Sequence, residues 1–272
     1  MKSYKEVIIT PVKETEIDLF TGLLANLDYS GFEQENDMLK AYINEQDFDY
    51  VELKALAQEF HFHFTTQEIG EQNWNALRES NFIPVQVEDF VGIRADFHPS
   101  FDDTVQYELV ITPKMSFGTG HHATTYMMIQ QMHHLDFSGK RVLDFGTGTG
   151  VLAILAEKLG AKDIIAIDND EWSIRNTREN LEANHSHQVK LFLASHVKTE
   201  HPFDIILANI NRNIIIDNFT ALTHAIRPGG QLVLSGLLAE DEAAILELAT
   251  QNGWQHHNTL KRLQWISILL SR

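Results

Sequence analysis

Three glycines at alternate positions, Gly146, Gly148 and Gly150, follow a short apolar run that ends at Phe145, and a helical pattern begins directly after them. Glycine lets the backbone turn sharply and approach a ligand closely, and the first N–H groups of a helix have no partners inside the helix. In an open α/β sheet, ligands bind at the carboxyl ends of the strands, beside such a turn. The spacing therefore predicts a ligand-binding turn over residues 146–150, with a plain glycine turn as the alternative.

Asp168 ends the next apolar run, about 20 residues beyond the glycines, where a carboxylate can accept hydrogen bonds from both ribose hydroxyls. It therefore indicates a ligand that contains adenosine, without indicating the reaction. A dinucleotide-binding turn requires Gly-x-Gly-x-x-Gly with a pyrophosphate at the helix start, but Val151 occupies the last glycine position. The pattern favours adenosine without a pyrophosphate, and an NAD-dependent enzyme is the weaker alternative. Asp170 is expected to cap the following helix.

Two further segments contain polar residues that could contact a ligand. Asn209 ends the apolar run 203–208, and its amide can both donate and accept hydrogen bonds, so it could hold the ligand, an incoming amine, or both. Capping of the next helix is its alternative role. The segment Phe117–Thr125 holds two glycines, two histidines and three threonines, a composition that suits a loop closing over a ligand. Thr124 or Thr125 is expected to cap the helix 126–133 or to bind the ligand.

Metal and nucleophilic chemistry are not indicated by the remaining residues. The chain has 14 histidines and no cysteine, which excludes thiolate ligands. The neighbouring pairs His121-His122 and His133-His134 point in different directions on a helix or strand, and no His-Glu-x-x-His set accompanies them. No Gly-x-Ser-x-Gly nucleophile turn is present. We expect neither a metal site nor a catalytic triad.

From Lys140 onward, strands and helices alternate, as is typical of a parallel sheet covered on both faces. The last two strands have no helix between them and are expected to form a hairpin, which places one antiparallel strand in a seven-stranded sheet. A turn is expected at 227–230. The expected strands are 141–145, 163–168, 189–194, 203–209, 231–235, 254–260 and 263–270, and the expected helices are 151–159, 171–183, 213–226 and 240–251.

The first 70 residues show a different order, β-α-β-β-α-β, which matches a small α+β ferredoxin-like domain. Residues 71–80 are predicted to form a helical linker, and residues 81–272 the α/β domain. No apolar stretch approaches the ~20 residues of a membrane helix. A cytoplasmic protein without a membrane partner is expected.

Acidic residues dominate the charge of the chain, whose net charge is −17. Residues 1–70 contain 14 Asp or Glu and 5 Lys, a net charge of −9, so roughly half of the excess lies in the first quarter of the chain. A nucleic-acid-binding protein usually presents a basic face, so direct binding to nucleic acid is not expected. The acidic region is either a solvated surface or a patch that attracts a basic macromolecule.

These motifs together resemble the bacterial methyltransferases that modify large-subunit ribosomal protein L11. The resemblance rests on Phe117–Thr125, Asp144–Gly150, Asp168, Ala208-Asn209-Ile210, Pro228–Gly230 and Ser235–Leu238, and extends over about Met115 to Arg272. It implies a Rossmann-like class I methyltransferase domain with S-adenosylmethionine as cofactor. It also implies an N-terminal domain that recognises a basic ribosomal protein, and methylation of lysine side chains and the N-terminal amine. We expect a monomer.

The resemblance also implies roles for individual residues. Those implied near the reacting groups are Asn209, Phe117 and His122. Those implied to bind the cofactor are Thr125, Gly146, Asp168, Asn209, Gly118, Thr119, Gly120, Gly148 and Gly150.

Three departures from the family pattern concern the same segments. Ala123 replaces a usual proline, Thr147 replaces a frequent cysteine, and Asn211-Arg212-Asn213 stands where small apolar residues are common.

The alternatives to this function are a methyltransferase that acts on another protein, a nucleic acid or a small molecule, and a binding module without catalysis.

Overall fold

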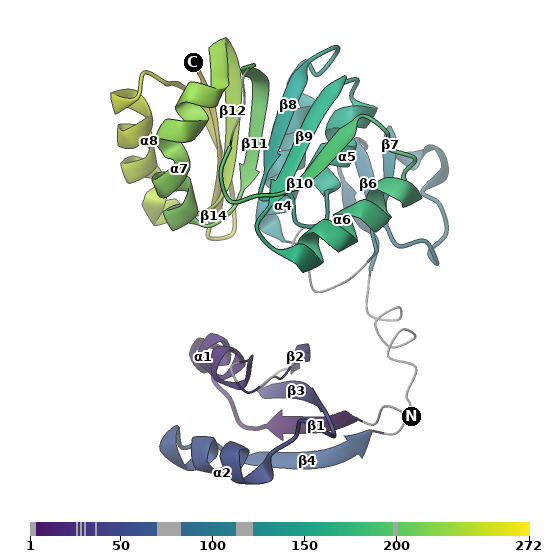
Figure 1. The fold of residues 1–272 in the computed structure, drawn as a ribbon, viewed down its shortest axis with the longest axis vertical. Coiled ribbons are helices and arrows are strands. Elements are labelled where there is room, and N and C mark those ends of the chain that lie inside the picture. Colours follow the sequence, from purple (N-terminus) through teal and green to yellow (C-terminus); the bar gives the residue numbers. More distant parts are fainter. Residues whose placement is uncertain are drawn as a thin grey trace. The chain divides into compact units, whose positions relative to one another are not determined.

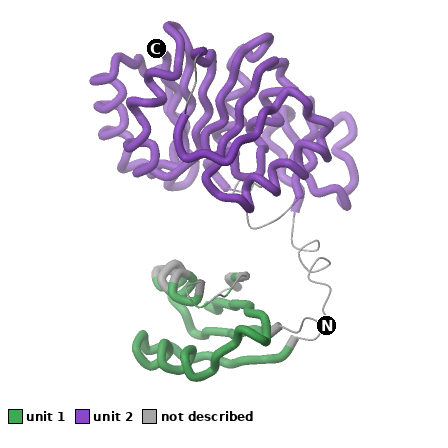
Figure 2. Tube along the Cα trace, viewed as in Figure 1, with its two compact units in different colours: residues 1–78 green, residues 79–272 purple. Residues whose placement is uncertain are grey.

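The computed structural model describes residues 4–25, 27, 29, 31–35, 37–69, 83–112, 122–197 and 201–272. The chain divides into two compact units, residues 1–78 and 79–272, which Figure 2 distinguishes by colour. The expected linker at 71–80 lies outside the described residues, as do Phe117, Gly118, Thr119 and Gly120. Within the described part of the chain, no helix is long and apolar enough to cross a membrane.

Unit 1 is a four-stranded sheet with strand order β2-β3-β1-β4, in which each neighbouring pair is antiparallel (Figure 1). Side chains alternate between the two faces of a strand, and Val7 and Ile9 of β1 lie in one core with Phe20 of α1 and Leu53 of α2. The predicted element order is observed: β1 (Tyr4–Ile9), α1 (Glu14–Ala25), β2 (Gly31–Glu35), β3 (Met38–Asn44), α2 (Tyr50–Glu59) and β4 (Phe64–Ile69).

Unit 2 is built around a seven-stranded sheet with the order β10-β9-β8-β11-β12-β14-β13. Strand β14 runs antiparallel to both of its neighbours, and the other neighbouring pairs are parallel. The predicted sheet and its hairpin are therefore confirmed. The strands and helices of this layer are α4 (Ala123–His133), β8 (Arg141–Phe145), α5 (Val151–Lys158), β9 (Asp163–Asp168), α6 (Glu171–Ala183), β10 (Val189–Leu193), β11 (Phe203–Asn209), α7 (Arg212–Ala225), β12 (Ile226–Leu238), η2 (Ala239–Asp241), α8 (Glu242–Gln251), β13 (Gln255–Arg262) and β14 (Trp265–Ser271).

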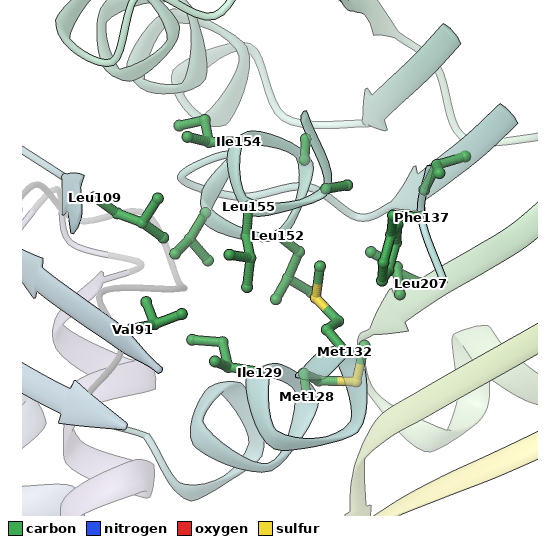
Figure 3. Packing of buried hydrophobic residues seen from close by; sticks show 14 of the residues in the cluster. Val91, Leu109, Met128, Ile129, Met132, Phe137, Leu152, Ile154, Leu155 and Leu207 are labelled. Atoms are coloured by element: carbon green, nitrogen blue, oxygen red, sulfur yellow. The ribbon is translucent and has the colours of Figure 1, made fainter. Parts of the chain in front are cut away.

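Successive residues of the central strands pack against opposite layers, because side chains alternate along a strand. Val142 lies in one apolar core with residues of α4 and α5, and Leu143 lies in the other with residues of α7 and α8. Figure 3 shows the first core, where Leu152 and Leu155 of α5 lie near Ile129 of α4. Two layers of helix thus fix the carboxyl ends of β8, β9 and β11 relative to one another.

A second, three-stranded sheet adds to the α4–α5 layer. It comprises β5 (Val85–Val87), β6 (Val91–Arg94) and β7 (Tyr107–Val110), with a short 3-10 turn, η1 (Asp102–Thr104), before β7. Val91 and Leu109 pack in the same core as α5, as Figure 3 shows. Strand β7 is also held by Asn184, whose side chain accepts a hydrogen bond from the Val110 N–H at 2.9 Å.

The turn predicted at 227–230 is wrong, because β12 runs through this segment. The Gly229 N–H donates to the Arg272 carbonyl at 2.8 Å, and the Arg272 N–H donates to the Gly230 carbonyl at 2.9 Å. Hydrogen bonds to Arg272, directly after β14, therefore keep the segment in the strand, although Gly229 has the positive φ of 76° that suits a turn. The helix expected to continue to Ile226 ends at Ala225.

Candidate active site

The turn after β8 is tied to the end of β9 through its backbone. The N–H groups of Gly146 and Thr147 both donate to the Ile167 carbonyl, at 2.9 and 3.0 Å. Gly146, Gly148 and Gly150 have φ values of 78°, 57° and 83°, a region that bulky side chains rarely occupy. The alternate glycines are therefore required by the backbone path.

Helix α6 holds this turn from the outside. The Thr177 hydroxyl donates to the Gly148 carbonyl at 2.7 Å, and the Asn180 amide donates to the Thr149 carbonyl at 2.8 Å. Both side chains are fully buried. A Cβ at Gly150 would lie 2.8 Å from the Thr177 methyl group, so Gly150 serves close packing against α6.

Asp168 lies at the carboxyl end of β9 and is only partly buried. One carboxylate oxygen accepts a hydrogen bond from the Gly148 N–H at 2.9 Å, and the other accepts from the Asp170 N–H at 3.0 Å. A carboxylate has about four acceptor positions, so both oxygens retain capacity for ligand hydroxyls. Asp170 caps α6, as predicted, by accepting from the N–H groups of Trp172 and Ser173.

Asn209 ends β11 and contacts Thr125 of α4. Its Nδ2 donates to the Thr125 hydroxyl at 3.2 Å, whereas its Oδ1 is buried and has no hydrogen-bond partner among the residues that the structure describes. Buried polar atoms in folded proteins almost always have a partner, so the free Oδ1 is an acceptor suited to a ligand N–H. Asn211, not Asn209, caps α7 by accepting from the Ile214 N–H at 3.0 Å.

His122 lies at the start of α4 and acts as its cap. Its Nδ1 lies 2.7 Å from the Thr124 hydroxyl, and its side chain accepts from the Thr124 N–H. The expectation that Thr124 or Thr125 caps a helix beginning at 126 is wrong, since the helix begins at Ala123 and both threonines are fully buried inside it. Burial lowers the pKa of His122, which favours a neutral imidazole.

A cavity of about 420 Å³ opens at the carboxyl ends of these strands, within the size range of small-molecule sites. We call it the crevice. Five predicted residues line it: His122, Gly146, Gly148, Asp168 and Asn209. The other described residues that line it are Phe145, Asn169, Ser173, Ala194, Ser195, Ile210, Asn211, Ile214, Gly236 and Trp265. Of the remaining predicted residues, Thr125 contacts Asn209, and Gly150 faces Thr177.

Trp265 and Gly236 line the crevice but were not predicted as site residues. The hairpin brings Trp265 against His122, with ring centroids 4.7 Å apart and ring planes at 68°. Gly236 has φ of 84° and lies directly against Ile210, whose carbonyl a Cβ at this position would overlap. Gly236 belongs to the quoted Ser-Gly-Leu-Leu motif, which could have identified it, whereas no local pattern marks Trp265.

These groups fit a cofactor with a ribose at one end and a reacting group at the other. A carboxylate at Asp168, at the end of β9, faces the crevice beside a glycine turn. The Asn209 oxygen, unpartnered among the described residues, is buried at the end of β11, on the other side of β8. The sheet order, the single antiparallel strand and the position of the crevice define a class I S-adenosylmethionine-dependent methyltransferase, the predicted fold class.

Comparisons with known proteins agree with this class. The family model of the ribosomal protein L11 methyltransferases matches residues 10–272. A ribosomal protein L11 methyltransferase of Porphyromonas gingivalis is 40% identical over 263 residues, which cover 94% of this chain and 90% of the relative. One of Phocaeicola vulgatus is 34% identical over 275 residues, covering 97% and 98% of the two chains. The chain therefore belongs to the ribosomal protein L11 methyltransferase family.

Solved structures lead to the same class. The crystal structure of a ribosomal protein L11 methylase from Lactobacillus delbrueckii subsp. bulgaricus matches with a TM-score of 0.64 and 28% identity, over 70% of this chain and 98% of that chain. A methyltransferase from Pyrococcus furiosus, 20% identical with a TM-score of 0.51 over 60% of this chain and 88% of that chain, shares the fold. The cofactor of this chain is S-adenosylmethionine, as predicted.

Proposed function

We propose that this protein transfers methyl groups from S-adenosylmethionine to lysine side chains and to the N-terminal amine of ribosomal protein L11. The observation that carries the proposal is the buried Asn209 Oδ1, which accepts no hydrogen bond within the described part of the chain and belongs to a residue that lines the crevice. An amine N–H is a donor that matches this acceptor. The names of the P. gingivalis and P. vulgatus relatives support the choice of protein substrate.

When bound, the cofactor supplies a methyl group on a positively charged sulfur. The sulfur leaves as a neutral thioether, which is a good leaving group. The residues of the chain bind and orient. Asp168 accepts hydrogen bonds from the ribose hydroxyls, while its bond from the Gly148 N–H keeps the carboxylate in position. Asn209 holds the acceptor amine through Oδ1, and its bond to Thr125 fixes the orientation of the amide. Holding two reacting groups in line can remove several kcal/mol of barrier.

The acceptor amine must be neutral to attack, and a free lysine side chain has a pKa of about 10.4. Removal from water favours the neutral form of an amine, and the apolar walls formed by Phe145, Ile210 and Ile214 provide such surroundings. Solvent can accept the released proton, so no dedicated base is required. His122 serves as a positioning residue, because its Nδ1 contacts Thr124 and its ring packs on Trp265.

Unit 1 is proposed to recognise the substrate protein. Its share of the negative charge, −9 within residues 1–70, complements a basic ribosomal protein. A chain that begins at Glu79 should bind the cofactor with unchanged affinity, because every residue lining the crevice belongs to unit 2, but should lose methylation of L11. Equal turnover by the shortened and full chains would remove this role from unit 1.

The decisive experiment is mass spectrometry of purified L11 after incubation with the full chain and S-adenosylmethionine. We expect L11 to gain whole methyl groups on lysines and on its N-terminal amine. The matched control is Asn209→Leu, which keeps roughly the size of the side chain but removes both the Oδ1 acceptor and the donor to Thr125, and which should lose most of the methylation of L11. Labelling of another protein in a lysate, with none on L11, would assign a different substrate. A cytoplasmic location and a monomeric state stay predictions.

A further inference from the structure

The hairpin between β13 and β14 ends in an exposed leucine held in an unfavourable backbone conformation. Arg262 pairs directly with Trp265, so the connection is the two-residue turn Leu263-Gln264. Leu263 has φ of 56°, and 91% of its surface is exposed. Two-residue hairpin turns with positive φ normally carry Asn, Asp or Gly, and a bulky residue in this region is uncommon.

Leu263 therefore contributes little to the stability of the folded chain. Its side chain buries almost no apolar surface, and its backbone conformation costs free energy relative to Asn or Gly at the same position. Isolated exposed apolar residues are ordinary on protein surfaces, so exposure alone carries no conclusion. A second observation gives the exposure of Leu263 a meaning: the turn lies next to Trp265, which lines the crevice.

Three contacts hold this turn close to residues that line the crevice or lie next to it. Trp265, two residues after Leu263, lines the crevice and packs on His122. The Gln264 carbonyl accepts a hydrogen bond from the Ala239 N–H at 2.9 Å, which joins the turn to the segment that follows Gly236. The Arg262 guanidinium lies 3.7 Å from the centre of the Tyr126 ring, one residue after Thr125. The turn is thus braced on both sides against elements that carry crevice residues.

A second exposed apolar side chain lines the crevice itself. Ile214, in the first turn of α7, lines the crevice and is still 36% exposed. The acceptor amine must enter this crevice from a protein, because the proposed substrate is a ribosomal protein. An apolar residue on a rigid turn at such an entrance fits a side chain that neighbours the amine in the substrate.

We propose that Leu263 is a substrate-docking residue, which packs against an apolar side chain of the substrate protein beside the amine that is methylated. The inference rests on the proposed function and extends it from the reacting groups to the surface that selects the polypeptide. The partner that covers Leu263 is the protein substrate, since the adjoining crevice is the proposed binding site for the substrate's amine. The backbone strain is then tolerated in exchange for an apolar contact formed only in the complex.

The test compares three variants of the full chain in steady-state methylation of L11. Leu263→Asn removes the apolar side chain and suits the positive φ. His185→Asn is the matched control, because His185 is exposed, has φ of 54° and follows α6 at the opposite edge of the sheet. Leu263→Met keeps an apolar side chain of similar size at the turn.

We expect Leu263→Asn to raise the KM for L11 about fivefold with kcat and cofactor affinity unchanged, the size typical for a contributing interface residue. His185→Asn should leave the KM for L11 unchanged. Leu263→Met should have a KM close to that of the wild type. Both Asn variants should raise Tm slightly. An unchanged KM in Leu263→Asn overturns the docking role while L11 methylation by the wild type still supports the proposed function. A lower Tm in Leu263→Asn would mean that the leucine stabilises the folded chain itself, which overturns the docking role. Absence of L11 methylation by the wild type would overturn both the docking role and the proposed function.

Discussion

The Gly148 N–H donates a hydrogen bond of 2.9 Å to the Asp168 carboxylate, which joins the turn after β8 to the tip of β9. The same carboxylate is proposed to bind the ribose, so one side chain would both shape the glycine turn and contact the cofactor. Replacing Asp168 by Ala should lower the affinity for S-adenosylhomocysteine by at least tenfold in calorimetry, because at least one charge-assisted hydrogen bond is lost.

A matched control for Asp168→Ala is Asp170→Ser, which keeps a capping oxygen at the start of α6 and leaves the ribose site intact. This variant should bind the cofactor as the wild type does. Tight binding by Asp168→Ala, with circular dichroism showing an intact fold, would remove Asp168 from the site.

Gly236→Ala should disturb the tip of β11. Both this substitution and Gly229→Ala place a side chain at a positive φ, 84° and 76° respectively, which costs about 1 kcal/mol at either site. Only the Cβ at Gly236 would overlap the Ile210 backbone, since nothing lies within 4 Å of a Cβ at Gly229. Because Ile210 follows Asn209, we expect Gly236→Ala to lose most of its kcat.

Activity assays and urea unfolding of the two glycine variants measure these effects separately. Gly229→Ala should show the smaller loss of stability and retain activity. Equal activities of the two variants would mean that the Ile210 contact does not position Asn209.

Asn180→Ala should destabilise unit 2 and weaken cofactor binding together. The Asn180 amide donates to the Thr149 carbonyl at 2.8 Å, and its oxygen accepts from the Thr112 N–H at 2.9 Å. Loss of the two hydrogen bonds should cost about 1–3 kcal/mol of the free energy of unfolding. Asn252→Ala, which removes a single bond to the Leu248 carbonyl at the end of α8, is the control and should cost less. Denaturant unfolding measures the loss of stability, and calorimetry measures the cofactor affinity. Unchanged cofactor affinity in Asn180→Ala would show that the glycine turn does not depend on the hydrogen bonds of Asn180.

Asp144 should make the stability of unit 2 depend on pH between about 4 and 7. Burial raises the pKa of Asp144 to about 7, against the opposing hydrogen bond from Thr147. The folded chain then holds a proton that the unfolded chain, with an ordinary aspartate pKa of 3.8, has released. This contribution to stability is fully present below pH 3.8 and is lost as pH rises through 7. The loss amounts to at most about 1.4 kcal/mol per pH unit.

Asp144→Asn keeps the size of the side chain and cannot titrate, so it isolates this contribution. Chemical denaturation at several pH values between 4 and 8 should give a steeper fall in the free energy of unfolding for the wild type than for the variant. Parallel curves for the two proteins would place the Asp144 pKa at an ordinary value in the folded state.

Local patterns predicted the elements that hold the cofactor site, because each lies within one strand and its following turn. The spacing of the three glycines and the place of Asp168 at the end of the next strand are enough to predict that these residues lie at one edge of the sheet. The parallel direction of most strands was likewise predictable from alternating strands and helices, and the absence of a helix between 260 and 263 indicated the hairpin.

Contacts made by pairing across the sheet were not predictable. Trp265 enters the crevice only because the hairpin places β14 between β12 and β13. The cap of α4 was assigned to threonine by type, but the histidine ring accepts the bond and leaves Thr124 and Thr125 buried. The strand through 227–230 likewise depends on Arg272, a partner distant in the sequence.

The position of Trp265 gives the protein a built-in optical reporter. Of the four tryptophans, Trp265 lines the crevice, while Trp254 is buried and donates to the Thr223 hydroxyl at 2.8 Å. Replacing Trp74 and Trp172 by phenylalanine would leave one constant indole and one that senses the crevice. The emission of such a double variant would follow ligand entry in real time, without any added dye.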